Sequence, residues 1–225
     1  MNSTTYSHIS QAWQFIEETS MRFDSEAIQS LRVATSKDAH APELMSSSQA
    51  AFLRMQAQLV SARNVLLIGV DSGIEIPALI DGMRQEGQLT VVTPSSASAQ
   101  RTREIFDSLR STRTRMRYVS SDVPTFLHRL NAHDYDIIIV SSQAENYITA
   151  TQEAQRLLRA QGILILTDAM AMTDDNSQGG VPNPADRHDK AVALRTIIDE
   201  LMSNEKYDAT LLAIGTGLLM AVVRD

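Results

Sequence analysis

The sequence predicts one α/β domain built on a doubly wound, mostly parallel β-sheet, with a helical extension at the N-terminus. Three observations lead to this prediction. Short apolar runs recur at similar intervals from residue 64 onward, and helical patterns fill the gaps between them. No strand candidate precedes residue 64, and the chain ends in two apolar runs around a glycine-bracketed turn. Strands that alternate with helices in this way form a parallel sheet, and the final pair forms an antiparallel hairpin.

Residues 1–62 are expected to form helices only. Their apolar side chains recur at spacings near three and four, the period of amphipathic helices. Residues 40–42 interrupt this pattern, because a proline disfavours the helical conformation in the residue before it. The serines at 46–48 then offer an N-cap for a third helix. We therefore expect 1–62 to extend the domain formed by 63–225, the two making one structural unit.

From residue 64 the expected strands are five short runs followed by the hairpin. The runs are apolar on both faces, as in a parallel sheet that helices cover on both sides. They lie at 65–68, 89–92, 116–119, 137–140 and 163–166, and the hairpin strands lie at 209–214 and 218–223. Helical patterns lie at 74–83, 97–109, 123–130, 147–158 and 185–202. Residues 173–187 are rich in Asp, Asn, Gly and Pro, and we expect a loop at the carboxyl edge of the sheet, where ligands usually bind.

Composition excludes several classes of protein. The chain has 225 residues, a formal net charge of −7 and no cysteine, which rules out disulfides, thiolate metal sites and cysteine nucleophiles. It has no apolar run of ~18 residues and its first residues do not resemble a signal peptide, so we expect a cytoplasmic protein with no membrane partner. The acidic balance weighs against nucleic acid as a partner. The arginines between 110 and 117 have no interleaved aromatics and are expected to form a solvated edge.

Four segments carry a resemblance to a known family. Residues 64–73, 135–147, 157–168 and 214–225 resemble the S-adenosylmethionine-dependent O-methyltransferases of the catechol and caffeoyl-CoA type, most closely the bacterial and especially actinobacterial members. The resemblance spans nearly the whole chain. It implies the class I methyltransferase fold, which is Rossmann-like with a seven-stranded sheet, S-adenosylmethionine as the cofactor and a small-molecule substrate. It also implies a homodimer, since in this family the N-terminal extension commonly supports dimerisation and covers the active site.

The glycine-rich turn after the first strand departs from the family pattern. The family has an acidic strand residue followed by G-x-G-x-G, whereas here Leu67 precedes Gly69, Asp71 and Gly73. Glycine allows the backbone to come close to a ligand. The resemblance makes Gly69, Asp71 and Gly73 candidates for cofactor binding, with Asp71 meeting the sulfonium or the amino group. The alternative is a turn that has lost its ligand.

Three further positions are candidates for cofactor binding. Thr93 stands where the family places a carboxylate for the ribose hydroxyls, and Asp122 matches an acid near the adenine. Ser141 lies in the stretch that matches the family's Ile-Asp-Ala-Asp-Lys segment. Each of the first two has another interpretation. Thr93 fits a capped loop before the next helix, and Asp122 fits a helix N-cap followed by Pro124.

The metal site of the family is largely absent from this sequence. Family members hold a divalent cation with an Asp after the fourth strand and an Asp-Asn pair after the fifth, and the metal takes both oxygens of a catechol-like substrate. Here Asp168 matches, whereas Ser141 and Ala169 replace the other ligands and alanine replaces the family lysine. One carboxylate rarely makes a metal site, so we expect no divalent metal, although the loop adds Asp174 and Asp175 nearby.

Two hypotheses of function follow. The first is a divergent S-adenosylmethionine-dependent O-methyltransferase that works without a metal, through proximity and orientation. Its candidate catalytic residues are Asp168 and His188, with His188 as a general base. His188 also fits a solvated helix start. The second hypothesis is a protein of this fold that no longer catalyses and acts as a structural or regulatory dimer, which the missing acidic residues favour.

Overall fold

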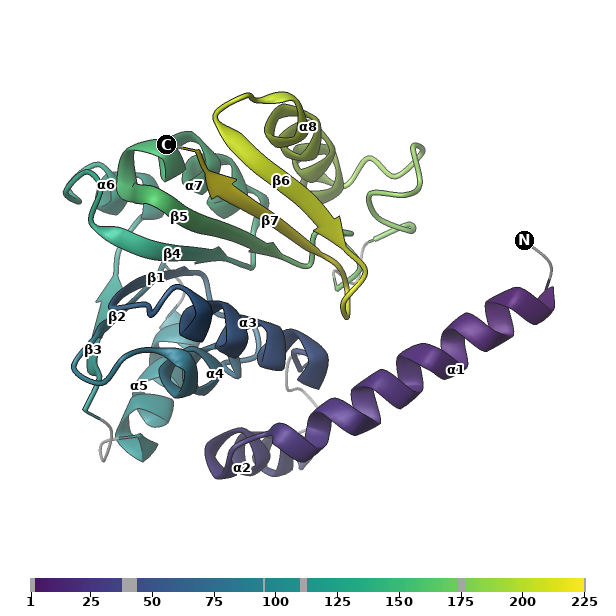
Figure 1. The fold of residues 1–225 in the computed structure, drawn as a ribbon, viewed down its shortest axis with the longest axis horizontal. Helices are drawn as coiled ribbons and strands as arrows, with labels where there is room; N and C mark the ends of the chain where they lie inside the picture. Colours follow the sequence, from purple (N-terminus) through teal and green to yellow (C-terminus); the bar gives the residue numbers. More distant parts are fainter. Residues whose placement is uncertain (1–2, 38–43, 95, 110–112, 174–176, 225) are drawn as a thin grey trace.

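The fold centres on a seven-stranded sheet with the strand order β3-β2-β1-β4-β5-β7-β6 (Figure 1). The computed structural model describes residues 3–37, 44–94, 96–109, 113–173 and 177–224. The strands are β1 Asn64–Ile68, β2 Gln88–Thr93, β3 Arg115–Ser120, β4 Tyr135–Val140, β5 Leu158–Thr167, β6 Tyr207–Leu212 and β7 Leu218–Val223. β1 to β5 run parallel, and β7 is antiparallel to both β5 and β6. The parallel sheet and the C-terminal hairpin predicted from the sequence are confirmed.

Helices cover both faces of the sheet, because the central strands β1, β2 and β4 are buried on both faces, whereas the outer strands β3 and β6 are partly exposed. They are α4 Glu75–Gly82, α5 Ser96–Ser108, α6 Val123–Leu127, α7 Ala144–Leu157 and α8 Asp189–Ser203. One apolar cluster, which includes Tyr147 and Leu194, lies on the face of α6, α7 and α8. A second cluster, which includes Leu79, lies on the opposite face with α4 and α5. Successive side chains of a strand point to opposite faces of the sheet, so Ile138 belongs to the first cluster and Ile139 to the second.

The N-terminal extension is entirely helical where it is described, as the sequence predicts. It comprises α1 Ser3–Ser20, the 3₁₀ helix η1 Met21–Phe23, α2 Glu26–Thr35 and α3 Ser47–Leu59. Ser46 caps α3 by accepting a hydrogen bond from the Gln49 amide at 3.1 Å, which confirms the predicted cap. Residues 40–42, where a break is predicted, lie outside the described residues. Ile28 of α2 and Leu53 of α3 belong to the second apolar cluster, so these helices share a core with the sheet.

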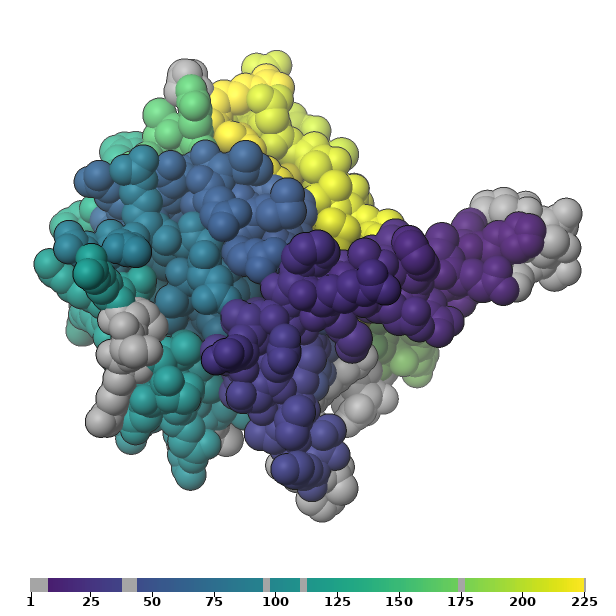
Figure 2. All heavy atoms as spheres, turned by 60° about the horizontal axis from the view of Figure 1, so that its bottom comes forward, coloured from purple at the N-terminus to yellow at the C-terminus, as the bar shows by residue number. Residues whose placement is uncertain are grey.

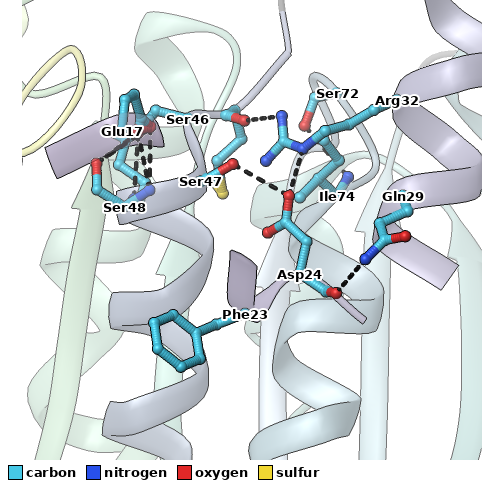
Figure 3. A network of polar contacts seen from close by, with 12 residues as sticks. Glu17, Phe23, Asp24, Gln29, Arg32, Ser46, Ser47, Ser48, Ser72 and Ile74 are labelled. Carbon is cyan, nitrogen blue, oxygen red and sulfur yellow. Dashed lines mark hydrogen bonds and ion pairs between the residues drawn. The ribbon is translucent and has the colours of Figure 1, made fainter. Parts of the chain in front are cut away.

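Helix α1 runs as an arm beyond the body of the protein (Figures 1 and 2). Polar contacts hold its base (Figure 3). The Glu17 carboxylate accepts hydrogen bonds from the Ser48 amide at 3.0 and 3.1 Å. Just after the arm, Arg32 pairs with Asp24 at 2.7 Å. These contacts orient the arm against the start of α3, while Trp13 on the arm stays 57% exposed.

Local differences from the predicted elements lie mainly at helix and strand ends. β5 begins at Leu158 rather than near residue 163, and α8 begins at Asp189 rather than at 185. The described residues between Thr173 and α8 form a loop, as predicted. No helix in the described ranges is long and apolar enough to cross a membrane.

Candidate active site at the carboxyl edge of the sheet

The first turn of the site follows β1 and packs tightly against the end of β4. Gly69 has φ +78°, and a Cβ there would lie 2.5 Å from the Ser141 carbonyl oxygen. The Gly69 amide bonds to the Val92 carbonyl at 2.9 Å, and the Ser141 amide bonds to the Ile68 carbonyl at 2.9 Å. Gly69 is therefore required by the close approach of two backbones at this edge.

The second glycine of the turn faces α5. Gly73 has φ +84°, and a Cβ there would lie 2.4 Å from Cδ1 of Ile105. Ser98 and Arg101 of the same helix donate hydrogen bonds to the carbonyls of Val70 and Asp71, at 3.3 and 3.5 Å. Helix α5 thus holds the turn in place.

Asp71 occupies the middle of the turn, where the family has glycine. Its carboxylate is half-buried and accepts a hydrogen bond from the Ser142 amide at 3.1 Å. Ser142 itself has φ +81°, a conformation that is strained for a residue with a side chain. Asp71 therefore connects the turns that follow β1 and β4.

Glu75, at the start of α4, is a buried carboxyl group that the sequence reasoning missed. It is 1% exposed and accepts a hydrogen bond from the Ser72 hydroxyl at 3.0 Å. Burial raises the pKa of Glu75 above its ordinary value, and the nearby charge of Asp71 raises it further. Neither Glu75 nor Asp71 has an ion-pair partner in the part of the chain that the structure describes. The turn after β1 therefore places two carboxyl groups near each other without a cationic side chain paired to either among the described residues.

Thr93 and Asp122 lie at the ends of the outer strands. Thr93 is buried at the end of β2 and pairs in register with Ser120 of β3. Asp122 is exposed and caps α6, because its carboxylate accepts a hydrogen bond from the Thr125 amide at 3.0 Å. Hydrogen bonds from Thr125 also keep the pKa of Asp122 below its ordinary value. The structure therefore supports the interpretation of Asp122 as the N-cap of α6.

Ser141 carries a buried hydroxyl with an unused hydrogen-bonding capacity. The residue is fully buried at the end of β4, and its Oγ has no partner among the described residues. Its carbonyl, in contrast, accepts a hydrogen bond from Nδ2 of Asn146 at 2.9 Å. A buried polar atom without a partner costs free energy unless a ligand or water supplies one.

Asp168, just after β5, is saturated by donors from its own chain. Oδ1 accepts a hydrogen bond from the Met172 amide at 3.0 Å, and Oδ2 accepts one from the Thr173 hydroxyl at 2.6 Å. The ammonium of Lys190, at the start of α8, lies 2.8 Å from the same Oδ2. Both side chains are almost fully buried, with 6% exposure for Lys190 and 4% for Asp168.

Tyr147 lies beneath this ion pair. Its ring centroid is 5.4 Å from Nζ of Lys190, and its hydroxyl donates to the Thr167 carbonyl at 2.9 Å. Burial raises the pKa of Tyr147 well above its ordinary value, and the charges of Asp71 and Asp168 add to this effect. The Tyr147 phenol is therefore neutral. The Asp71 and Asp168 carboxylates both lie near enough to Tyr147 to affect its pKa.

The loop between Asp168 and α8 is held from two sides. The Asp186 carboxylate accepts hydrogen bonds from the amides of Gln178, Gly180 and His188 at 2.7, 2.8 and 2.9 Å. These bonds, that from His188 foremost, keep the pKa of Asp186 below its ordinary value. Arg195 of α8 donates from its guanidinium to four carbonyls of the loop. His188 is the half-buried N-cap residue of α8, at the end of this ordered loop.

The residues at this edge do not fit a divalent metal. Of the positions that the resemblance assigns to metal ligands, the described chain offers a serine, an alanine and an aspartate whose oxygens are already bonded. Within the described residues no group of three His, Cys, Asp or Glu side chains has the arrangement of a metal site. Asp174 and Asp175 lie outside the described residues.

Comparison with known proteins identifies the family. A model of the O-methyltransferase family matches residues 17–224. The chain belongs to the O-methyltransferase family. A protein of Mycolicibacterium smegmatis named as an O-methyltransferase is 28% identical over 176 residues, which cover 78% of this chain and 80% of that protein. One of Mycobacterium tuberculosis strain H37Rv, also named as an O-methyltransferase, is 26% identical over 175 residues, covering 78% of this chain and 75% of that protein.

Solved structures share the fold of this O-methyltransferase family member. A Klebsiella pneumoniae protein described as an O-methyltransferase has a TM-score of 0.78 at 20% identity, covering 97% of this chain and 100% of that one. The O-methyltransferase of Bacillus cereus in complex with SAH has a TM-score of 0.76 at 19% identity, covering 95% and 99%. The Rossmann-like methyltransferase fold expected from the resemblance is confirmed.

The structure groups some of the predicted site residues and separates others. Asp71, Ser141 and Asp168 lie at the ends of adjacent strands β1, β4 and β5, whereas Asp122 lies beyond the outer strand β3. Lys190 and Glu75 are the site residues that sequence reasoning missed. Glu75 could have been noticed in the sequence, because it is a charged residue among the apolar residues at the start of a helix. No sequence pattern indicates that Lys190 pairs with Asp168.

Proposed function

We propose that this protein transfers a methyl group from S-adenosylmethionine to an oxygen of a small molecule without using a divalent metal. Membership of the O-methyltransferase family supports the reaction class. The B. cereus structure holds SAH, and that of a Streptomyces achromogenes O-methyltransferase holds SAM, which supports the cofactor. The saturated Asp168 supports the absence of a metal.

The observation that carries the proposal is the pair of carboxyl groups without cationic partners, Asp71 and Glu75, in the turn after β1. A buried carboxylate is stabilised by a positive group close by. When bound, S-adenosylmethionine supplies a methyl group on a positively charged sulfur, and it also carries an ammonium group. Asp71 and Glu75 attract these positive groups, while Gly69 and Gly73 shape the turn and the Ser141 hydroxyl provides an unused hydrogen-bonding group.

Calorimetric titration of the full chain with S-adenosylmethionine and S-adenosylhomocysteine, with and without Mg²⁺, tests this proposal. We expect both compounds to bind and Mg²⁺ to have no effect. Glu75→Gln should weaken the binding of S-adenosylmethionine more than that of S-adenosylhomocysteine, which lacks the positive sulfur. Glu104→Gln, at an exposed position of α5, is the matched control. No binding of either compound up to millimolar concentration would refute the proposal and favour the non-catalytic role.

We further propose that the protein is a homodimer that forms through α1 and α3. Large apolar side chains are exposed along these helices, namely Trp13, Phe15, Ile16, Met55 and Leu59. A hollow of about 380 Å³ lies between α1, α3 and the turn of the β6–β7 hairpin. An exposed apolar surface of this kind marks an interaction site. Light scattering should give twice the 24.8 kDa mass for the wild type and a monomer for Trp13→Glu.

A further inference from the structure

The ammonium of Lys190 lies beside Asp168, the one residue of this chain that the resemblance matches to a metal ligand. Nζ lies 2.8 Å from Oδ2 of Asp168, at the edge of the sheet where the other candidate residues gather. The remaining contacts of the Asp168 carboxylate come from the Met172 amide and from the amide and hydroxyl of Thr173. The chain itself therefore supplies the positive charge that this carboxylate needs.

The ammonium is fixed in position. The Lys190 side chain is 6% exposed, and its Nζ lies 5.4 Å from the centroid of the Tyr147 ring. Tyr147 is fully buried and its hydroxyl is bonded to the Thr167 carbonyl. A buried ion pair that loses one partner leaves an uncompensated charge, so the pair holds its geometry. A lysine is also a compact point charge rather than a multidentate binding group.

We propose that Lys190 is the built-in cation of the substrate site and holds the reacting oxygen of the substrate as an anion, in place of a divalent metal. This inference rests on the methyltransferase function proposed above. The substrate hydroxyl loses its proton to solvent when it binds near the ammonium. The electron pair of the resulting oxyanion then forms a bond to the methyl carbon of S-adenosylmethionine. The bond between that carbon and the sulfur breaks, and its electrons remain on sulfur.

The same reasoning narrows the class of substrate. A divalent ion binds two neighbouring oxygens of a catechol-like compound at once. An ammonium that is already paired with a carboxylate does not chelate two oxygens as a divalent ion does, so it does not require a vicinal pair. The substrate class that fits Lys190 is therefore a compound with one acidic hydroxyl group, a phenol or an enol.

A variant with a negative charge at position 190 tests whether the Lys190 ammonium takes the role of a divalent cation beside Asp168. In thermal unfolding, we expect the melting temperature of the wild type to be unaffected by millimolar MgCl₂, CaCl₂ or MnCl₂. Lys190→Glu places a second carboxylate beside Asp168, so this variant should melt lower and regain stability when a divalent cation is added. Lys206→Glu makes the same change of net charge at an exposed position and should show no dependence on divalent cations.

Two results of this experiment would overturn the inference. One is a wild type stabilised specifically by divalent cations, and the other is a Lys190→Glu variant that no divalent cation stabilises. If Lys190→Glu does not fold, the double variant Asp168→Asn/Lys190→Met replaces it, because it removes both charges together and leaves no unpaired ion. The double variant should then fold and carry the second experiment.

The second experiment measures the effect of Lys190 on a bound phenol. 4-Nitrophenol is titrated with pH in the presence of S-adenosylhomocysteine, and the absorbance of the phenolate reports its ionisation. Since an opposite charge nearby favours the ionised form, the acid dissociation constant should rise about tenfold or more on binding to the wild type. It should not rise with Asp168→Asn/Lys190→Met. 4-Nitrocatechol should bind no more tightly than 4-nitrophenol.

Failure of this inference is distinguishable from failure of the proposed function. Calorimetry with S-adenosylhomocysteine reports cofactor binding alone, and the cation dependence of Lys190→Glu reports the charge at Asp168 alone. Cofactor binding combined with no 4-nitrophenol binding, or with equal ionisation in wild type and double variant, overturns the role of Lys190 and leaves the proposed function intact. A marked preference for 4-nitrocatechol overturns the proposed substrate class.

Discussion

The Asp71 carboxylate joins two turns of the candidate site, because its Oδ2 accepts a hydrogen bond from the backbone amide of Ser142 at 3.1 Å. One turn follows β1 and the other follows β4, and the two strands are neighbours in the sheet. Ser142 has a positive φ of +81°, so this bond supports a strained backbone conformation. The acidic residue that departs from the G-x-G-x-G pattern thus has a structural contact in addition to its proposed attraction for the cofactor.

Replacement of Asp71 by glycine should weaken both stability and cofactor binding. The variant loses a hydrogen bond to a charged group, which contributes about 1.5–3 kcal/mol, and it adds a flexible residue to the turn. Chemical denaturation measures the first effect, and titration with S-adenosylmethionine measures the second. Asp71→Asn keeps an acceptor oxygen and should lose less stability. Tighter cofactor binding by Asp71→Gly would instead mean that the side chain obstructs the turn.

Glu75→Gln should stabilise the protein at neutral pH. Burial and the charge of Asp71 raise the pKa of Glu75 above its ordinary value of 4.5, so the folded protein holds this proton more tightly than the unfolded chain. The stability that the protonated Glu75 carboxyl group contributes is therefore fully present below pH 4.5, and it is lost as the pH rises through the folded-state pKa of Glu75. Glutamine mimics the neutral form and can still accept the bond from Ser72. The melting temperature of Glu75→Gln should exceed that of the wild type at pH 7, and the difference should shrink toward pH 4.5.

The opposite result would also be informative. A melting temperature that falls at pH 7 in Glu75→Gln would show that the charged carboxylate is stabilised in the folded protein by a group that the described contacts do not contain. Asp81→Asn, on the same helix, is a control for the general loss of one negative charge.

Arg195→Ala should loosen the loop that lies between Asp168 and α8. The guanidinium of Arg195 bonds to the carbonyls of Gly180, Val181, Asn183 and Asp186 at 2.6–3.1 Å. Loss of these bonds leaves carbonyl acceptors of buried and half-buried residues with fewer donors and should cost on the order of 2 kcal/mol. Hydrogen exchange at residues 177–188 should become faster than in the wild type. Arg187→Ala, at an exposed position of the same loop, should leave this exchange unchanged.

The sequence predicts the fold well because the signals for its elements are local. Apolar runs specify the strands of the sheet, and Ser46 and Asp122 mark helix starts that the structure confirms. The candidate site is less predictable, because its contacts join residues that are distant along the chain. Asp168 can be picked out from the resemblance, but its pairing with Lys190 depends on how the intervening loop returns to the sheet. The burial of Glu75 likewise depends on the packing of α4.

The contact between Glu17 and the start of α3 should help to hold the α1 arm against the body of the protein (Figure 3). Glu17 accepts hydrogen bonds from the Ser48 amide at 3.0 and 3.1 Å, and its negative charge lies at the N-terminus of a helix, where it is favourable. Glu17→Gln should cost about 0.5–2 kcal/mol, the range for loss of a helix cap, and should speed hydrogen exchange in α1. Glu18→Gln is the matched control, because Glu18 is exposed and bonds within α1 to Gln14. Equal exchange in the two variants would show that the Glu17 contacts do not hold the arm.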